Sequence, residues 1–155
     1  MLAEKESRVK NLFASAEKQE NGVYTVNMLK TGEWTTIVVD DCFPCQDDEP
    51  AFSRASGNEL WVLLLEKAWA KKYGSYARIE AGFAENVMHD LTGAPAISVE
   101  TSDEKLWDEL VVADRSGHMI GASAGNSEDS ERALKSMGLV AQHAYALLKV
   151  AEIED

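Results

Sequence analysis

Residues 58–71 have the sequence Asn-Glu-Leu-Trp-Val-Leu-Leu-Leu-Glu-Lys-Ala-Trp-Ala-Lys, and this stretch decides the fold more than any other. Its apolar residues recur at the i, i+3, i+4, i+7 and i+8 positions that form one face of a helix: Trp61, Leu64, Leu65, Ala68 and Trp69. Ser56 and Glu59 have the spacing of a capping box, and Gly74 is a residue type that often follows a helix end. We therefore predict a mostly buried central helix that begins after Ser56 and stops at Gly74.

Before this helix, the sequence predicts a first helix and a hairpin. Val9, Leu12 and Phe13 are spaced as the apolar stripe of an amphipathic helix, which we place within residues 1–18. A β-hairpin is predicted over residues 23–40, because two segments rich in β-branched and aromatic residues flank a short link that contains glycine. The following residues, up to position 57, are predicted to form a loop that can hold a short strand near Phe52.

After the central helix, two further helices and two strands are predicted. One helix spans residues 83–91 and ends at Gly93, and another begins at a second capping box, Thr101-x-x-Glu104, so that the helices fall within residues 57–114. Strands are predicted within residues 118–152, at about 119–122 and 141–152, with a polar loop over residues 125–131 between them. This order lacks regular strand and helix alternation and indicates an α+β fold, a single domain over residues 1–155 with helices packed on an antiparallel β-sheet.

Charge and cysteine content exclude several classes of function. The chain carries 27 acidic and 15 basic residues, a net charge of −12, so nucleic acid is not an expected partner. Its apolar runs are too short for a transmembrane segment and no signal peptide is visible, so we expect a cytoplasmic protein. Cys42 and Cys45 form a single C-x-x-C in an acidic loop that contains proline, which favours two reduced cysteines over a zinc site or a redox pair.

Three stretches, in this order, resemble the second half of the calpain-type, papain-like cysteine protease core. They are Gly32-Glu33-Trp34 with residues 37–41 and Pro44; residues 58–71 with Gly74-Ser75-Tyr76 and residues 90–93; and Gly138-Leu139-Val140 leading to His143-Ala144-Tyr145. The resemblance spans nearly the whole chain and implies the second subdomain of that core, an α+β unit that carries the catalytic histidine.

By this resemblance His143 is the catalytic histidine of an intracellular, calcium-dependent cysteine endopeptidase that performs limited proteolysis. An imidazole can take the proton of a thiol and so activate it as a nucleophile. The resemblance places the nucleophilic cysteine before Met1 and the orienting asparagine after Asp155, so this chain is expected to be a fragment that is inactive alone. Its expected partners are protein substrates and the remaining first subdomain of the protease core.

A binding or scaffold module with a degenerate active site is the alternative. Gln142 stands where the family usually has glycine, and Ala146 stands where it usually has serine. These two departures are compatible with a relative that has lost catalysis. The residue at the nucleophile position of the parent protein distinguishes the two hypotheses.

Glu59 has two interpretations. It completes the predicted capping box, and by resemblance it matches a carboxylate that helps to bind calcium in the first-subdomain calcium site of the calpain core. Calcium takes six to eight oxygen ligands, and the other ligands of that site lie outside this chain. We therefore expect calcium binding to be weak or absent in this chain. The acidic residues 40–41 and 46–49 could bind calcium loosely, although a solvated acidic face is the more typical role.

Overall fold

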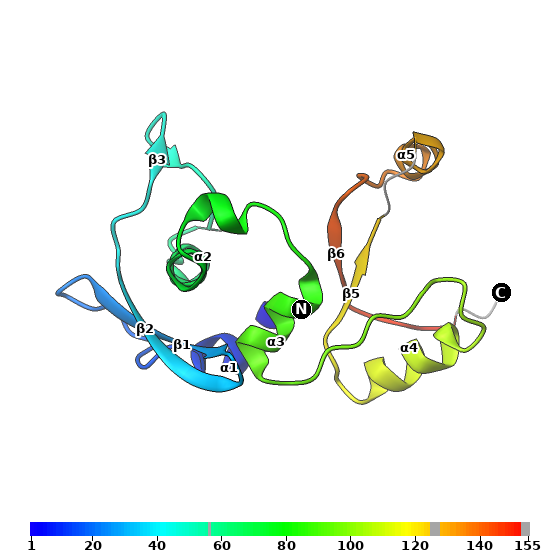
Figure 1. Cartoon of the computed structure of the whole chain (residues 1–155), viewed down its shortest axis with the longest axis horizontal. Coiled ribbons are helices and arrows are strands. Elements are labelled where there is room, and N and C mark those ends of the chain that lie inside the picture. The colour runs from blue at the N-terminus through cyan, green and yellow to red at the C-terminus, as the bar shows by residue number, and fades with distance from the viewer. Residues whose placement is uncertain (56, 125–127, 153–155) are drawn as a thin grey trace. The chain divides into compact units, whose positions relative to one another are not determined.

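The computed structural model describes residues 1–55, 57–124 and 128–152, which form helices and small antiparallel sheets (Figure 1). The chain divides into two compact units: Lys5–Ala96, and Met1–Glu4 together with Ile97–Asp155. Within the described residues, each sheet has two strands, paired β1 with β2, β3 with β4, and β5 with β6. The predicted α+β class is confirmed.

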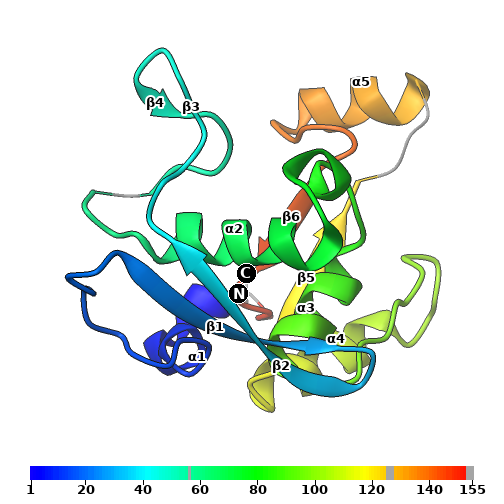
Figure 2. The same cartoon turned by 60° about the vertical axis from the view of Figure 1, so that its left-hand side comes forward.

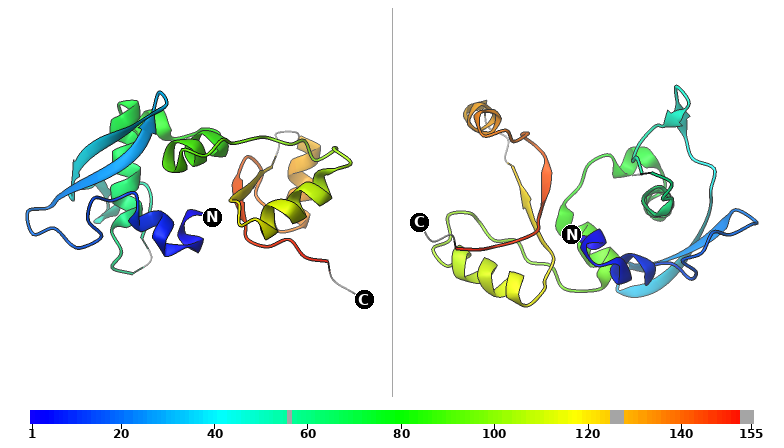
Figure 3. Two further views of the ribbon diagram at one scale, coloured as in Figure 1. Left: turned by 90° about the horizontal axis from the view of Figure 1, so that it is seen from below. Right: turned by 180° about the vertical axis from the view of Figure 1, so that it is seen from behind.

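The unit Lys5–Ala96 contains most of the buried apolar residues. Its elements are α1 (Glu6–Lys10), β1 (Val23–Lys30), β2 (Glu33–Asp40), β3 (Cys45–Gln46), β4 (Glu49–Pro50), α2 (Trp61–Tyr73), the 3-10 helix η2 (Tyr76–Ile79) and α3 (Ala84–Thr92). Figure 2 shows α2 beside the β1–β2 hairpin, against which it packs, and Figure 3 shows the same unit from two other sides.

The β1–β2 hairpin confirms the predicted span of residues 23–40. Its register runs from Val23 opposite Asp40 to Lys30 opposite Glu33. The two linking residues, Thr31 and Gly32, have φ angles of 51° and 83°, as a two-residue type I′ turn requires. Alternate residues of the hairpin are buried and form its core face: Tyr24, Val26, Met28, Ile37 and Val39.

The first helix is much shorter than the predicted span of residues 1–18. Only the 3-10 turn η1 (Leu2–Glu4) and α1 are helical there. Phe13 forms an isolated antiparallel bridge with Val26, and the N–H of Asn27 donates to the carbonyl oxygen of Leu12 at 2.7 Å. The backbone polar groups near Leu12 and Phe13 therefore form hydrogen bonds with β1 and do not continue the helix.

The loop after β2 contains a small hairpin that lies earlier than the strand predicted near Phe52. β3 and β4 pair through a turn at Asp47 and Asp48, whose φ angles of 52° and 64° again fit a type I′ turn. Phe52 itself is outside the strands and stacks on Tyr76, with ring centroids 4.5 Å apart. The aromatic contact explains its apolar character without a strand.

Helix α2 ends as predicted but begins later. Its last residue precedes Gly74, which has φ 104° and donates its N–H to the Ala70 carbonyl oxygen at 2.7 Å. The N-cap is Leu60, with no side-chain capping bond, so the predicted role of Glu59 in a capping box is wrong. The Glu59 carboxylate instead accepts a hydrogen bond from the indole Nε1 of Trp61 at 3.0 Å, and Ser56 lies outside the described residues.

Lys72 connects three elements of this unit. Its side chain is only 5% exposed, and its Nζ donates to the Leu29 carbonyl oxygen of β1 at 2.6 Å and forms an ion pair with Asp90 of α3. The same ammonium lies 5.0 Å from the ring centroids of Trp69 and Tyr73. Helix α2, helix α3 and the hairpin are therefore joined by one buried cation.

Helix α3 confirms the predicted helix over residues 83–91 and its end at Gly93. Gly93 has φ 70° and lies against the indole of Trp34, where a Cβ atom would come within 3.2 Å of the ring. A larger residue would thus be strained in its backbone and crowded against the tryptophan. Leu91 is buried, and α3 packs against β1.

The second unit is smaller and carries α4 (Leu106–Arg115), β5 (Ile120–Ser123), α5 (Glu128–Ser136) and β6 (Ala144–Leu147). Helix α4 begins after the predicted start at Thr101. The Asp103 carboxylate accepts a hydrogen bond from the N–H of Lys105 at 2.9 Å. The backbone carbonyl oxygen of Asp103 accepts one from the N–H of Leu106 at 3.1 Å. This local turn occupies the backbone that the capping-box prediction assigned to helix.

The strands and the loop between them also differ from prediction. β5 and β6 are antiparallel as expected, but β6 is shorter than the predicted residues 141–152. The predicted polar loop over residues 125–131 is wrong from Glu128 onward, where α5 begins, and residues 125–127 lie outside the described residues. Residues 131–135 are Glu, Arg, Ala, Leu and Lys, all good helix formers, which outweigh the polar composition of the preceding residues.

We predict that Lys72→Met lowers the free energy of unfolding of the unit Lys5–Ala96 by about 3–5 kcal/mol, because it leaves the largely buried Asp90 carboxylate without its cation. Lys71→Met is the matched control, since within the described residues Lys71 donates one exposed hydrogen bond, to the Val38 carbonyl oxygen, and its loss should cost about 1 kcal/mol. Native-state hydrogen exchange of the β1 amides measures both. Equal effects of the two substitutions would contradict the assignment.

Candidate functional site

His143 lies directly before β6 and its side chain is exposed. Its carbonyl oxygen accepts the N–H of Ala124 at 3.1 Å, which extends the β5–β6 pairing by one residue pair. The imidazole meets the ring of Tyr145 edge-on, with centroids 5.0 Å apart and an interplanar angle of 78°. The backbone of His143 is therefore held by a strand pair while its side chain is exposed.

The residues around His143 close a short loop. The N–H of Val140 donates to the Tyr145 hydroxyl at 2.6 Å, and that hydroxyl lies 3.3 Å from the Val140 carbonyl oxygen, to which it can donate. Gln142 has φ 53°, in the left-handed region that favours glycine. The position at which the family usually has glycine thus does have a glycine-like backbone in this chain.

Glu59 lies in the other unit and offers a single ligand. Its carboxylate is exposed, and one of its oxygens accepts the Trp61 indole N–H. Among the described residues, no group of three or more histidine, cysteine, aspartate or glutamate side chains is placed to hold a metal ion. The residues present therefore do not form a calcium site by themselves, although Glu59 can contribute one ligand to a larger one.

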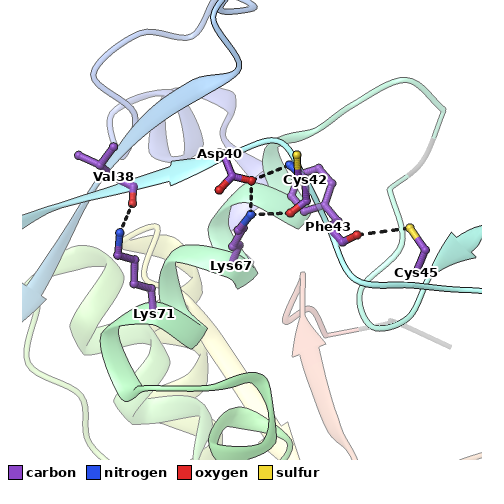
Figure 4. A network of polar contacts seen from close by, with 7 residues as sticks. All are labelled: Val38, Asp40, Cys42, Phe43, Cys45, Lys67 and Lys71. Atoms are coloured by element: carbon purple, nitrogen blue, oxygen red, sulfur yellow. Dashed lines mark hydrogen bonds and ion pairs between the residues drawn. The ribbon is translucent and has the colours of Figure 1, made fainter.

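The acidic end of β2 is already neutralised from within the chain. Lys67 Nζ lies 2.5 Å from Asp40 Oδ1 and 2.5 Å from the Cys42 carbonyl oxygen, and the Cys42 N–H donates to the same carboxylate at 2.8 Å (Figure 4). The hydrogen bond from Lys67, followed by that from the Cys42 backbone, lowers the pKa of Asp40 to about 2. Asp40 therefore serves as an internal partner of Lys67 and is not a free ligand for a loosely bound cation.

Cys42 and Cys45 are both free, exposed thiols on the loop after β2. The Sγ of Cys45 lies 3.5 Å from the Phe43 carbonyl oxygen and can donate to it, as Figure 4 shows. Neither cysteine is at a helix N-terminus, and both belong to the unit Lys5–Ala96, whereas His143 belongs to the other unit. The cation that lies beside Cys42, Lys67, bonds the Cys42 carbonyl oxygen and the Asp40 carboxylate.

Two functional features were not anticipated from the sequence. Tyr145 was part of the quoted motif, but its hydroxyl contacts with Val140 were not predicted. The pairing of Lys67 with Asp40 joins residues 27 positions apart. The one sequence signal for Tyr145 was its place in the His143-Ala144-Tyr145 motif. No local pattern predicts the pairing of Lys67.

Comparison with known proteins identifies the family of this chain. Residues 1–155 match the calpain family of cysteine proteases. The chain belongs to this family. Two plant relatives are each 36% identical to it over 159 aligned residues and match 96% of this chain: the calpain-type cysteine protease ADL1 of Oryza sativa subsp. japonica and the calpain-type cysteine protease DEK1 of Zea mays.

Animal calpains are also similar. Calpain-9 of Mus musculus is 34% identical over 137 residues and the calpain-1 catalytic subunit of Rattus norvegicus is 31% identical over 136, each matching 85% of this chain. The chain spans 7% of the length of the two plant relatives and 20% and 19% of these animal calpains. The part of the calpain-family chain that the structure describes contains no helix long and apolar enough to cross a membrane.

We predict that Asp40 titrates near pH 2 in the folded chain and that Lys67→Met returns its pKa toward the ordinary value of 3.8. Because the folded-state pKa lies below the unfolded value, the stabilisation from this carboxylate is present above about pH 3.8 and is lost as the pH falls through about 2. A carbon-13 NMR titration of the carboxyl groups measures the pKa, with Lys71→Met as the control. An Asp40 midpoint that does not move in Lys67→Met would show that the pair does not form in solution.

Proposed function

We propose that this chain is the part of a calcium-dependent, calpain-type cysteine endopeptidase that supplies the catalytic histidine, His143, and that it is inactive alone. The observation that carries the proposal is the placement of His143 at the start of β6, with its backbone paired to β5 and its imidazole exposed, within a chain that matches the family throughout. The substrates would be proteins cut at limited sites. The remaining protease subdomain would be the partner that completes the active site.

The chemistry explains why such a histidine must be held firmly. A neutral imidazole takes the proton of a cysteine thiol to form the thiolate nucleophile, and it later returns that proton to the leaving amine. Both transfers require hydrogen-bond distance, so the ring must have one position and one tautomer. In this chain the backbone pairing with Ala124 and the edge contact with Tyr145 are the restraints that the structure provides.

The calcium dependence rests on Glu59. Its exposed carboxylate is placed just before α2, and its one described partner is an indole N–H, so an oxygen remains available for a cation. The other ligands would come from the rest of the protease core. Two exposed free thiols, Cys42 and Cys45, suit a reducing compartment and support an intracellular location for the protein.

A longer polypeptide, extended upstream through the expected nucleophilic cysteine and downstream through the expected asparagine, should cleave casein in calcium. We predict that His143→Ala lowers its kcat by at least about 10³-fold, because the members of a catalytic triad act as a unit. His118→Ala is the matched control, since His118 is an exposed histidine of the same unit and should leave the rate unchanged. The 155-residue chain alone should show no cleavage.

The alternative is a calpain-like scaffold whose active site has degenerated. The substitution of Ala146 for the usual serine favours it. A longer polypeptide that is inert and has no cysteine at the nucleophile position would establish the scaffold role. Cleavage by the short chain, with covalent labelling of Cys42 or Cys45 by a thiol-directed epoxide, would overturn both assignments.

Calcium should bind the 155-residue chain only weakly, with a dissociation constant of about 1 mM or higher, because one carboxylate cannot replace a full set of oxygen ligands. Isothermal titration calorimetry at physiological ionic strength measures this. In the longer polypeptide, Glu59→Gln should raise the calcium concentration needed for activity at least about tenfold. Glu80→Gln, at an exposed carboxylate outside α2, is the control. A micromolar site in the short chain that Glu59→Gln abolishes would contradict the partial-site assignment.

A further inference from the structure

The segment from Gly138 to His143 joins α5 to β6, and we call it the 138–143 loop. Its first end is fixed to α5, because the N–H groups of Gly138 and Leu139 donate to the carbonyl oxygens of Lys135 and Leu134, at 3.1 and 2.8 Å. Its other end is fixed to β5 by the hydrogen bond between the Ala124 N–H and the His143 carbonyl oxygen. Between these ends the loop forms no strand pairing with the part of the chain that the structure describes.

Burial does not hold the middle of this loop. Val140 is 62% exposed, and Leu139 and Gln142 are exposed as well. Gln142 also adopts a left-handed backbone conformation, which is energetically unfavourable for a residue that has a Cβ atom. A loop with these properties relaxes unless specific polar contacts restrain it.

The Tyr145 hydroxyl supplies the contact. It accepts the Val140 N–H at 2.6 Å and faces the Val140 carbonyl oxygen at 3.3 Å, so a single hydroxyl engages both polar groups of one loop residue. The same side chain presents its ring to the imidazole of His143, two residues earlier on the same side of the strand. One tyrosine therefore touches both the middle of the 138–143 loop and the residue at its end.

We propose that Tyr145 is the positioning residue of His143: its hydroxyl closes the 138–143 loop and thereby holds the tyrosine ring in place against the imidazole. This inference deepens the proposed function, on which it rests for the catalytic role of His143. It assigns the hydroxyl a role that the ring alone cannot perform. Tyr145→Phe separates the two, since it removes both contacts with Val140 and keeps the aromatic edge.

The first experiment uses the 155-residue chain and does not depend on activity. In Tyr145→Phe the Val140 amide should exchange with solvent about fivefold faster, the effect of losing one ordinary hydrogen bond. The ring protons of His143 should move toward the shifts of a freely rotating histidine in proton–nitrogen NMR spectra. Tyr24→Phe is the matched control: it also removes a hydroxyl that accepts a backbone N–H, that of Gln19, but it lies in the other unit and should leave His143 unchanged.

Each outcome decides the proposal. Faster exchange at Val140 with a changed His143 ring, while the Ala124 amide keeps its protection, supports it. Unchanged His143 signals would show that the hydroxyl has no positioning role. Loss of protection at Ala124 as well would show that the hydroxyl holds the strand pair and has a merely structural role, which also overturns the proposal.

The longer polypeptide distinguishes this inference from the proposed function. Tyr145→Phe should lower kcat about tenfold with KM unchanged, because a displaced base slows proton transfer without weakening substrate binding. If His143→Ala abolishes activity but Tyr145→Phe has full kcat, the positioning role fails and the function stands. If His143→Ala keeps full activity while the Tyr145→Phe spectra change as expected, the loop contact is real and the proposed function fails.

Discussion

The buried ammonium of Lys72 is the constraint on which the larger unit depends. A charged group removed from water needs close partners, and this one has a carboxylate from α3, a carbonyl oxygen from β1 and two aromatic rings from its own helix. The carboxylate and the carbonyl oxygen come from segments far from Lys72 in the sequence, so both reach the ammonium only when α2, α3 and the hairpin are all in place. The ion pair thus favours one arrangement of these elements, whereas the apolar contacts around it would tolerate several.

Two more lysines of α2 repeat this arrangement nearer to solvent. Lys67 and Lys71 lie four residues apart, on one side of the helix, and both donate to the β2 segment, at Asp40 with Cys42 and at Val38. In a chain with a net charge of −12, basic residues are fewer than acidic ones, and these two lysines bond to groups of the same chain. The consequence is that Asp40 is already paired within the chain and is not a free ligand for a cation.

Local patterns in the sequence were sufficient to predict the hairpin, α2 and α3, because periodicity and positive-φ turn residues act over a few positions. They failed where another partner, near or far in the sequence, competes for the same group. Phe13 pairs with Val26 instead of continuing a helix, and the Glu59 carboxylate binds the Trp61 indole instead of capping α2. In α5 the error was of a different kind, since the polar residues that suggested a loop precede a run of strong helix formers.

His143 itself was predicted from a resemblance, because a single histidine next to a short strand has no distinguishing local pattern. What the structure adds is the physical reason that its position depends on its neighbours. A two-stranded sheet such as β5–β6 is only marginally stable by itself, so contacts in the adjoining loop add support to the position of His143. The glycine-like backbone at Gln142 increases the need for this support, and the Tyr145 hydroxyl provides it from within the same strand. In our proposal the base is positioned by a contact between two residues five positions apart, Val140 and Tyr145, which helix and strand periodicity do not predict.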